Sequence, residues 1–174
     1  MLNQLIQDKN TVIRIVLTDT LSITLIYFIP VISHLSPFPL YYSEPMRLVA
    51  IAAYFASRNK WNAYLLALTL PVFSLAFSGH PTFFKASLIS VELFLNMLLL
   101  DTLIQNLKWK TFLALVISIS VSKIFYYAMK YIFISISLLQ GNLISIPIPI
   151  QMASVAITAS FYFILINIFH KNKP

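Results

Sequence analysis

The chain has 174 residues, of which 59% are hydrophobic and only 10% charged, and it contains no cysteine. Soluble domains carry about 25% charged residues, so this composition indicates an all-α integral membrane protein. The lack of cysteine excludes a disulfide framework, cysteine-ligated zinc and thiol catalysis. The net charge of +7 comes without the basic runs that bind nucleic acid, so we expect no nucleic-acid partner.

Apolar segments in chain order predict a single membrane domain of six transmembrane helices. A helix rises 1.5 Å per residue and must cross a hydrocarbon core of about 30 Å, which takes roughly 20 residues. The second segment is shorter than that. The expected spans are residues 12–34, 46–56, 61–77, 83–104, 111–139 and 151–169.

The first span carries Thr18 and Ser22, small residues four positions apart. Small residues at this spacing let helices approach closely. The stripe could dock a partner subunit or pack inside the protein, and internal packing is the commoner use. The following residues, 34–47, contain three prolines and read as an interfacial loop.

The fourth span is unusually polar on one side. Lys85, Glu92 and Asn96 fall on one helix face at 3.6 residues per turn. Polar residues inside a membrane are expensive, and they usually face a cavity, a partner or a ligand. The alternative is an internal ion pair that only fastens two helices.

The fifth span carries a second polar face, with Lys123, Tyr126, Tyr127 and Lys130 at i, i+3, i+4 and i+7. A bare lysine near the bilayer centre costs roughly 2.5–3.5 kcal/mol, so Lys123 needs a partner, and Glu92 is the best-placed acid. Two cations, one anion and two aromatic rings would suit a small planar ligand with an anionic group. A structural Lys123–Glu92 pair with tyrosines as interface anchors is the alternative.

Basic residues divide unequally between the two sides that six spans would create. One side would hold eight of them and the other only Arg47 and Lys85, so both termini should be cytoplasmic in a multi-pass protein of the cytoplasmic membrane. The eight are Lys9, Arg14, Arg58, Lys60, Lys108, Lys110, Lys171 and Lys173. The outer loops, rich in proline, aromatic and amide residues, suit a binding mouth. They add Tyr42, His80 and Asn142 as candidate ligand contacts, although a solvated loop histidine is the commoner role for His80.

Residues 46–103 resemble substrate-binding S components of energy-coupling factor (ECF) vitamin transporters. The likeness consists of an outer Ser36-Pro37 loop, a short apolar helix and a cytoplasmic turn. A helix with Pro71 follows, and then a Gly79-x-Pro81 entry into a helix bearing Glu92-Leu93. The resemblance implies a subunit that captures a micronutrient from outside. It also implies two kinds of partner, a transmembrane coupling (T) subunit and two ABC-type ATPases.

Other functional classes receive less support from the residues. No phosphate-binding loop occurs, which is consistent with ATP being handled by separate chains. The three histidines are scattered and no catalytic constellation emerges, so we expect a non-enzymatic protein without a metal or cofactor. A structural scaffold of a cell-envelope complex would explain the apolar helices equally well. It would not explain Glu92, Lys123 and Lys130 on one outward-facing cavity.

Overall fold

The computed structural model describes residues 2–35, 43–57, 59–79 and 81–171. For residues 2–8, 10, 34 and 167–171 it describes the backbone alone. The candidates Tyr42 and His80 lie outside the described residues. The helices, in chain order, are α1 Leu2–Leu35, α2 Pro45–Ser57, α3 Lys60–Ser78, α4 Phe83–Asp101, the π-helix η2 Thr102–Asn106, α5 Thr111–Ser135 and α6 Ile148–Lys171. The described residues contain no strand, so the all-α expectation is confirmed.

Five of these helices are long and apolar enough to cross a membrane. The exception is α2, whose 13 residues span about 20 Å and therefore only part of a hydrocarbon core of about 30 Å. The described residues thus form a multi-pass membrane protein with six α-helices, one of which, α2, is short. The fifth helix ends at Ser135, earlier than expected, and α6 begins at Ile148, earlier than expected.

Local residue chemistry fixes the ends of α3. Asn59 caps its start, because its side-chain oxygen accepts a hydrogen bond from the Trp61 backbone N–H at 3.0 Å. Gly79 follows its end at φ 68, a left-handed conformation that suits glycine, and donates its N–H to the Leu75 carbonyl at 3.0 Å. These two caps allow the chain to reverse direction at both ends of α3.

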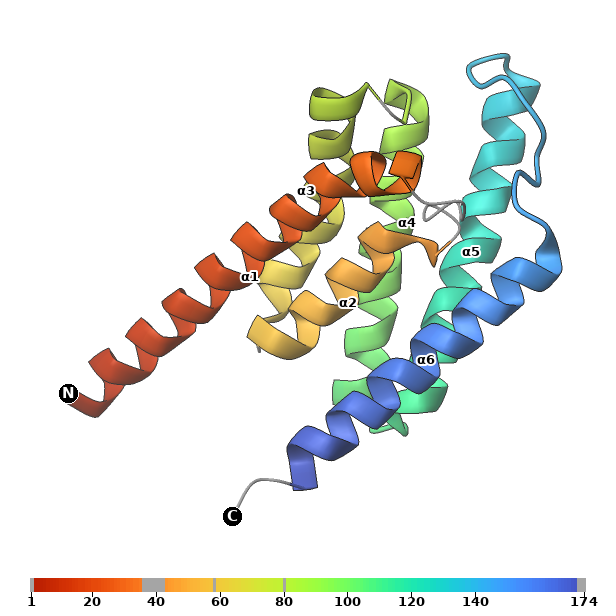
Figure 1. Cartoon of the computed structure of the whole chain (residues 1–174). Helices are drawn as coiled ribbons and strands as arrows, with labels where there is room; N and C mark the ends of the chain where they lie inside the picture. Colours follow the sequence, from red (N-terminus) through yellow and green to blue (C-terminus); the bar gives the residue numbers. More distant parts are fainter. Residues whose placement is uncertain (1, 36–42, 58, 80, 172–174) are drawn as a thin grey trace.

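The helices pack through small side chains. Ala50, Ala63, Ala67 and Ala114 are fully buried in the main core, where they allow close approach of neighbouring backbones, as is usual between membrane helices. The central helices α3, α4 and α5 lie side by side, α1 packs on α2 and α3, and α6 packs on α5 (Figure 1). The outer sides of α1 and α6 expose mainly apolar residues, as expected for surfaces that face lipid.

Figure 1 shows both chain ends on one side of the bundle. The start of α1 and the end of α6 point toward the end of the bundle that also holds the α2–α3 and α4–α5 connections. The α3–α4 and α5–α6 connections lie at the opposite end. This common side for the termini agrees with the expected arrangement of the basic residues.

The start of α2 lies inside the bundle. Glu44, which immediately precedes α2, pairs with Lys123 at the midpoint of α5. We expected residues 34–47 to form an interfacial loop, but α2 already begins at Pro45. Because α2 is about 20 Å long and ends beside the α2–α3 connection, its start falls short of the opposite face of a hydrocarbon core of about 30 Å.

The topology can be tested with single cysteines, because the natural chain has none. An impermeant thiol reagent added outside intact cells should modify Asn142→Cys and spare Asn106→Cys, both of which replace exposed residues. The reason is the excess of basic residues at the end of the bundle that holds Asn106. Labelling of Asn106→Cys alone would reverse the orientation.

Candidate functional site

Four charged side chains inside the bundle are linked one to the next by ion pairs, and we call them the ion-pair chain. In spatial order they are Lys123, Glu44, Arg47 and Glu92. Glu44 accepts hydrogen bonds from Lys123 through Oε1 and from Arg47 through Oε2. Arg47 donates to Glu44 through Nη1 and to Glu92 through Nη2. Two cations and two anions therefore alternate, and the group is neutral as a whole.

Two members of the ion-pair chain, Arg47 and Glu92, are buried, and the other two, Glu44 and Lys123, are partly buried. The side chains of Arg47 and Glu92 are 5% and 8% exposed, whereas those of Lys123 and Glu44 are 14% and 18% exposed. Removing one partner from a buried pair leaves an uncompensated charge, which is far more costly than losing both. Pairing is therefore what permits these charges at mid-depth of a membrane bundle.

Three elements supply the ion-pair chain. Glu92 comes from α4 and Lys123 from α5, while Glu44 and Arg47 come from the start of α2. The Glu44 carbonyl accepts the N–H groups of Arg47 at 2.9 Å and Leu48 at 3.2 Å, so Glu44 begins the helix and its side chain meets Arg47 one turn later. The Glu44 carboxylate also complements the positive end of the α2 dipole.

The structure corrects the expected partner of Lys123. The sequence suggested Glu92, but Lys123 pairs with Glu44, and Glu92 pairs with Arg47. The reason is that the start of α2 carries both Glu44 and Arg47 to the level of Glu92 and Lys123. Sequence reasoning missed these two residues by assigning them to an outer loop. Their signal was an acid three positions before a base at the start of an apolar helix.

Asn96 lies beside the ion-pair chain, one helical turn after Glu92 on α4. It is completely buried, and neither its amide nitrogen nor its amide oxygen has a hydrogen-bond partner among the described residues. The Arg47 Nε is likewise buried without a partner there. Buried polar atoms are nearly always hydrogen-bonded, so three unpartnered atoms in one region are a notable exception.

Lys130 belongs to a separate cluster at the far end of α5. Its ammonium group donates to the carbonyls of Asn142 and Leu143 and to the Ser145 hydroxyl, each at 2.8 Å. These contacts use all three donors of the lysine. Its Nζ also lies 6.0 Å from the ring centroid of Tyr126. Lys130 and Asn142 thus fasten the α5–α6 connection to α5 rather than joining the ion-pair chain.

The same connection is held by a second contact. The Tyr127 hydroxyl donates to Gln151 Oε1 at 2.7 Å, and Gln151 Nε2 donates to the Ile146 carbonyl at 2.6 Å. Lys85, in the first turn of α4, is half-buried. The predicted polar faces of α4 and α5 are therefore divided between the ion-pair chain at mid-depth and the loop contacts at one end.

Asp101 anchors the other end of α2. The hydroxyls of Tyr54 and Tyr64 donate to its two carboxylate oxygens, each at 3.0 Å, and the Lys60 ammonium lies 3.6 Å away. Arg47 binds Glu92 at the start of α2, and Tyr54 binds Asp101 near its end. The short helix is thus attached to α4 at both ends.

The helix α1 holds the proposed docking residues. Ser22 is 3% exposed and donates its hydroxyl to the Thr18 carbonyl at 2.7 Å, so in this arrangement it packs inside the protein. Thr18 is half-buried. Nearby, Asn62 donates to Asp19 at 2.9 Å and links α3 to α1. A docking role for Thr18 and Ser22 stays a prediction.

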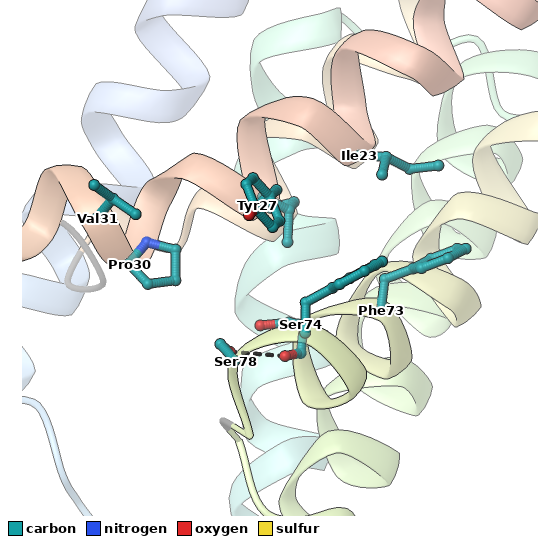
Figure 2. A pocket seen from close by; sticks show the side chains of 9 residues that line it. Ile23, Tyr27, Pro30, Val31, Phe73, Ser74 and Ser78 are labelled. Carbon is teal, nitrogen blue, oxygen red and sulfur yellow. Dashed lines mark hydrogen bonds between the residues drawn. The ribbon is translucent and has the colours of Figure 1, made fainter.

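A groove of about 210 Å³ lies between α1 and α3. Figure 2 shows Tyr27 and Pro30 of α1 facing Phe73 and Ser74 of α3 across it. The described residues that line it carry no charge, so they do not suit an anionic ligand. Neither this groove nor a smaller hollow of about 80 Å³ beside Val91 and Met129 is lined by the ion-pair chain.

Removing one member of the Arg47–Glu92 pair should destabilise the protein strongly. Arg47→Met or Glu92→Gln alone leaves a buried unpaired charge, with an expected loss of about 3–5 kcal/mol in the free energy of unfolding. The double variant keeps the Glu44–Lys123 pair and should recover much of that loss. Unfolding in detergent measures all three, with the exposed Lys9→Met as control. Strictly additive losses would mean that the two charges do not interact.

Replacing Lys130 should free the α5–α6 connection without affecting the ion-pair chain. Lys130→Met removes three charge-assisted hydrogen bonds, so amide hydrogen exchange in residues 142–146 should rise about tenfold or more. Lys85→Met, at the same end of the bundle, should leave that exchange unchanged. Equal exchange in the Lys130 variant and the natural protein would contradict the fastening role.

No protein-family model matches the chain, and neither a curated protein nor a solved structure matches it. The functional interpretation therefore depends on the geometry of the chain itself. Ionisable residues inside a membrane are functional-site candidates by default. Among the described residues, the ion-pair chain with its unpartnered neighbour Asn96 is accordingly the candidate functional site.

Proposed function

We propose that the chain is the substrate-capture subunit of an ECF-type importer, which binds a small anionic micronutrient from outside the cell. The buried Arg47 and the partly buried Lys123 converge on one carboxylate at mid-depth of the bundle, and this observation carries the proposal. A pair of cations converging on a carboxylate is the arrangement that recognises an anionic group of a ligand.

Three further features support a binding role. Asn96 and the Arg47 Nε offer unpartnered polar atoms within the same region. The Lys130 contacts hold the α5–α6 connection against the bundle and so shape one end of it. Tyr126 and Tyr127 lie on α5 between Lys123 and Lys130, where aromatic rings can pack against a planar ligand.

In this proposal the chain performs no chemistry. A transmembrane coupling subunit and two ABC-type ATPases drive uptake, and the protein lies in the cytoplasmic membrane as a multi-pass subunit. The resemblance of residues 46–103 to S components motivates these partners. A vitamin or related compound would be the ligand, since two cations favour a molecule with a carboxylate or phosphate group.

A scaffold of a cell-envelope complex is the second candidate. The ion-pair chain is neutral, and it lines neither the groove between α1 and α3 nor the hollow beside Val91, which favours internal bracing. A bracing role explains why the charges pair. It does not explain why the buried amide of Asn96 has no hydrogen-bond partner among the described residues. Binding of a small molecule separates the two functions.

The test is to purify the chain from its native membrane and identify co-purifying molecules by mass spectrometry. We expect an anionic small molecule together with a coupling subunit and ATPases. Lys123→Met should lower ligand occupancy about tenfold or more, because a lost charged hydrogen bond is worth about 1.5–3 kcal/mol. Lys9→Met should retain the ligand. Envelope-synthesis proteins without any bound small molecule would favour the scaffold instead.

A further inference from the structure

We propose that Glu44 is a built-in competitor: its carboxylate occupies the place of a ligand carboxylate between Arg47 and Lys123, and a small monocarboxylate binds by displacing it. This inference rests on the proposed function and specifies its ligand class. It is independent of the partner subunits.

The contacts of Glu44 are those that a bound carboxylate would make. One oxygen accepts from Lys123 and the other from Arg47, so the carboxylate bridges two cations supplied by different helices. Among the described residues, Glu92 makes its direct side-chain hydrogen bond with one cation, Arg47. Bridging of this kind is typical of carboxylate recognition, in which each oxygen has its own charged donor.

Charge balance favours an exchange of one anion for another. Arg47 and Lys123 contribute two positive charges, and Glu44 and Glu92 contribute two negative charges. When the Glu44 carboxylate leaves, the remaining three groups carry one net positive charge. A monoanion restores neutrality, whereas a neutral ligand or a cation leaves a charge unbalanced in a membrane interior.

Glu44 is also the member of the ion-pair chain that can leave most readily. Glu92 and Lys123 lie within long membrane-spanning helices, so displacing either side chain disturbs a packed core. Glu44 precedes α2, and its side chain has the highest exposed fraction of the four, at 18%. Its backbone has a φ of 50°, an uncommon left-handed conformation for a residue with a side chain.

Polar atoms for the rest of such a ligand are already present. The Asn96 amide and the Arg47 Nε are fully buried in the same part of the bundle and have no partner among the described residues. An amide can donate and accept, so it suits a polar substituent of the carboxylate-bearing molecule. This second observation distinguishes the site from a self-satisfied salt bridge.

The experiment uses the full chain in detergent and propionate as the probe. Glu44→Ala removes the competing carboxylate and opens space, so its melting temperature should rise as propionate is added. Half-maximal stabilisation should need at least about tenfold less propionate than in the natural protein, which must first displace Glu44. Sodium chloride at equal ionic strength serves as the salt control.

Two further variants keep the test decisive. Glu44→Gln retains the bulk of the side chain but not its charge, so propionate should displace it more readily than the natural carboxylate, and half-maximal stabilisation should need less propionate than in the natural protein. Glu44→Asp keeps the charge on a shorter side chain that cannot bridge both cations, so its response should lie between those of the natural protein and Glu44→Ala. Flat responses in both Glu44→Ala and Glu44→Asp would overturn the proposal, as would a Glu44→Ala chain that is equally unfolded with and without propionate.

The outcome is separable from that of the proposed function. Stabilisation of Glu44→Ala by propionate supports the exchange even when the natural chain carries no ligand and no transport partners, in which case the transport role fails alone. Flat propionate responses overturn the exchange even when the natural chain co-purifies with a micronutrient. That ligand would then bind elsewhere in the bundle.

Discussion

Charged side chains are tolerated at the middle of a bilayer when each has a partner of opposite charge. Here Lys123, Glu44, Arg47 and Glu92 satisfy one another in a single series that joins α5, the start of α2 and α4. The series also explains how a helix can begin at this depth. The first turn of α2 has unsatisfied N–H groups, and the two carboxylates beside it complement their partial positive charge.

The position of α2 follows from two attachments to α4. Arg47 binds Glu92 near the start of the short helix, and Tyr54 binds Asp101 near its end, so α2 and α4 run parallel over this length. A helix of 13 residues could otherwise slide or tilt with little loss of apolar contact in a lipid environment. Polar contacts at both ends fix its register, and this in turn fixes where the Glu44 carboxylate lies.

Much of the fold could be predicted from the sequence, because apolar runs of about 20 residues have few alternatives in a protein of this composition. The polar face with Glu92 on the fourth span and the polar face with Lys123 on the fifth were also visible from helical periodicity. The pairing of Glu92 with Arg47 and of Lys123 with Glu44 was not visible. It depends on the depth at which α2 begins, and a short apolar segment after a proline-rich loop does not reveal its depth. The loop contacts of Lys130 could not be predicted for a related reason: two of its partners are backbone carbonyls, which every residue carries and which therefore give no sequence pattern.

The central claim is that Glu44, and not Glu92, neutralises Lys123 inside the membrane. A zero-length carbodiimide cross-link, applied to the protein in lipid bilayers and mapped by mass spectrometry, tests this most directly because it joins only a carboxylate and an amine already in contact. We expect an amide bond between Glu44 and Lys123 in the natural protein and none in the Glu44→Gln variant. A bond between Glu92 and Lys123, with none at Glu44, would contradict it.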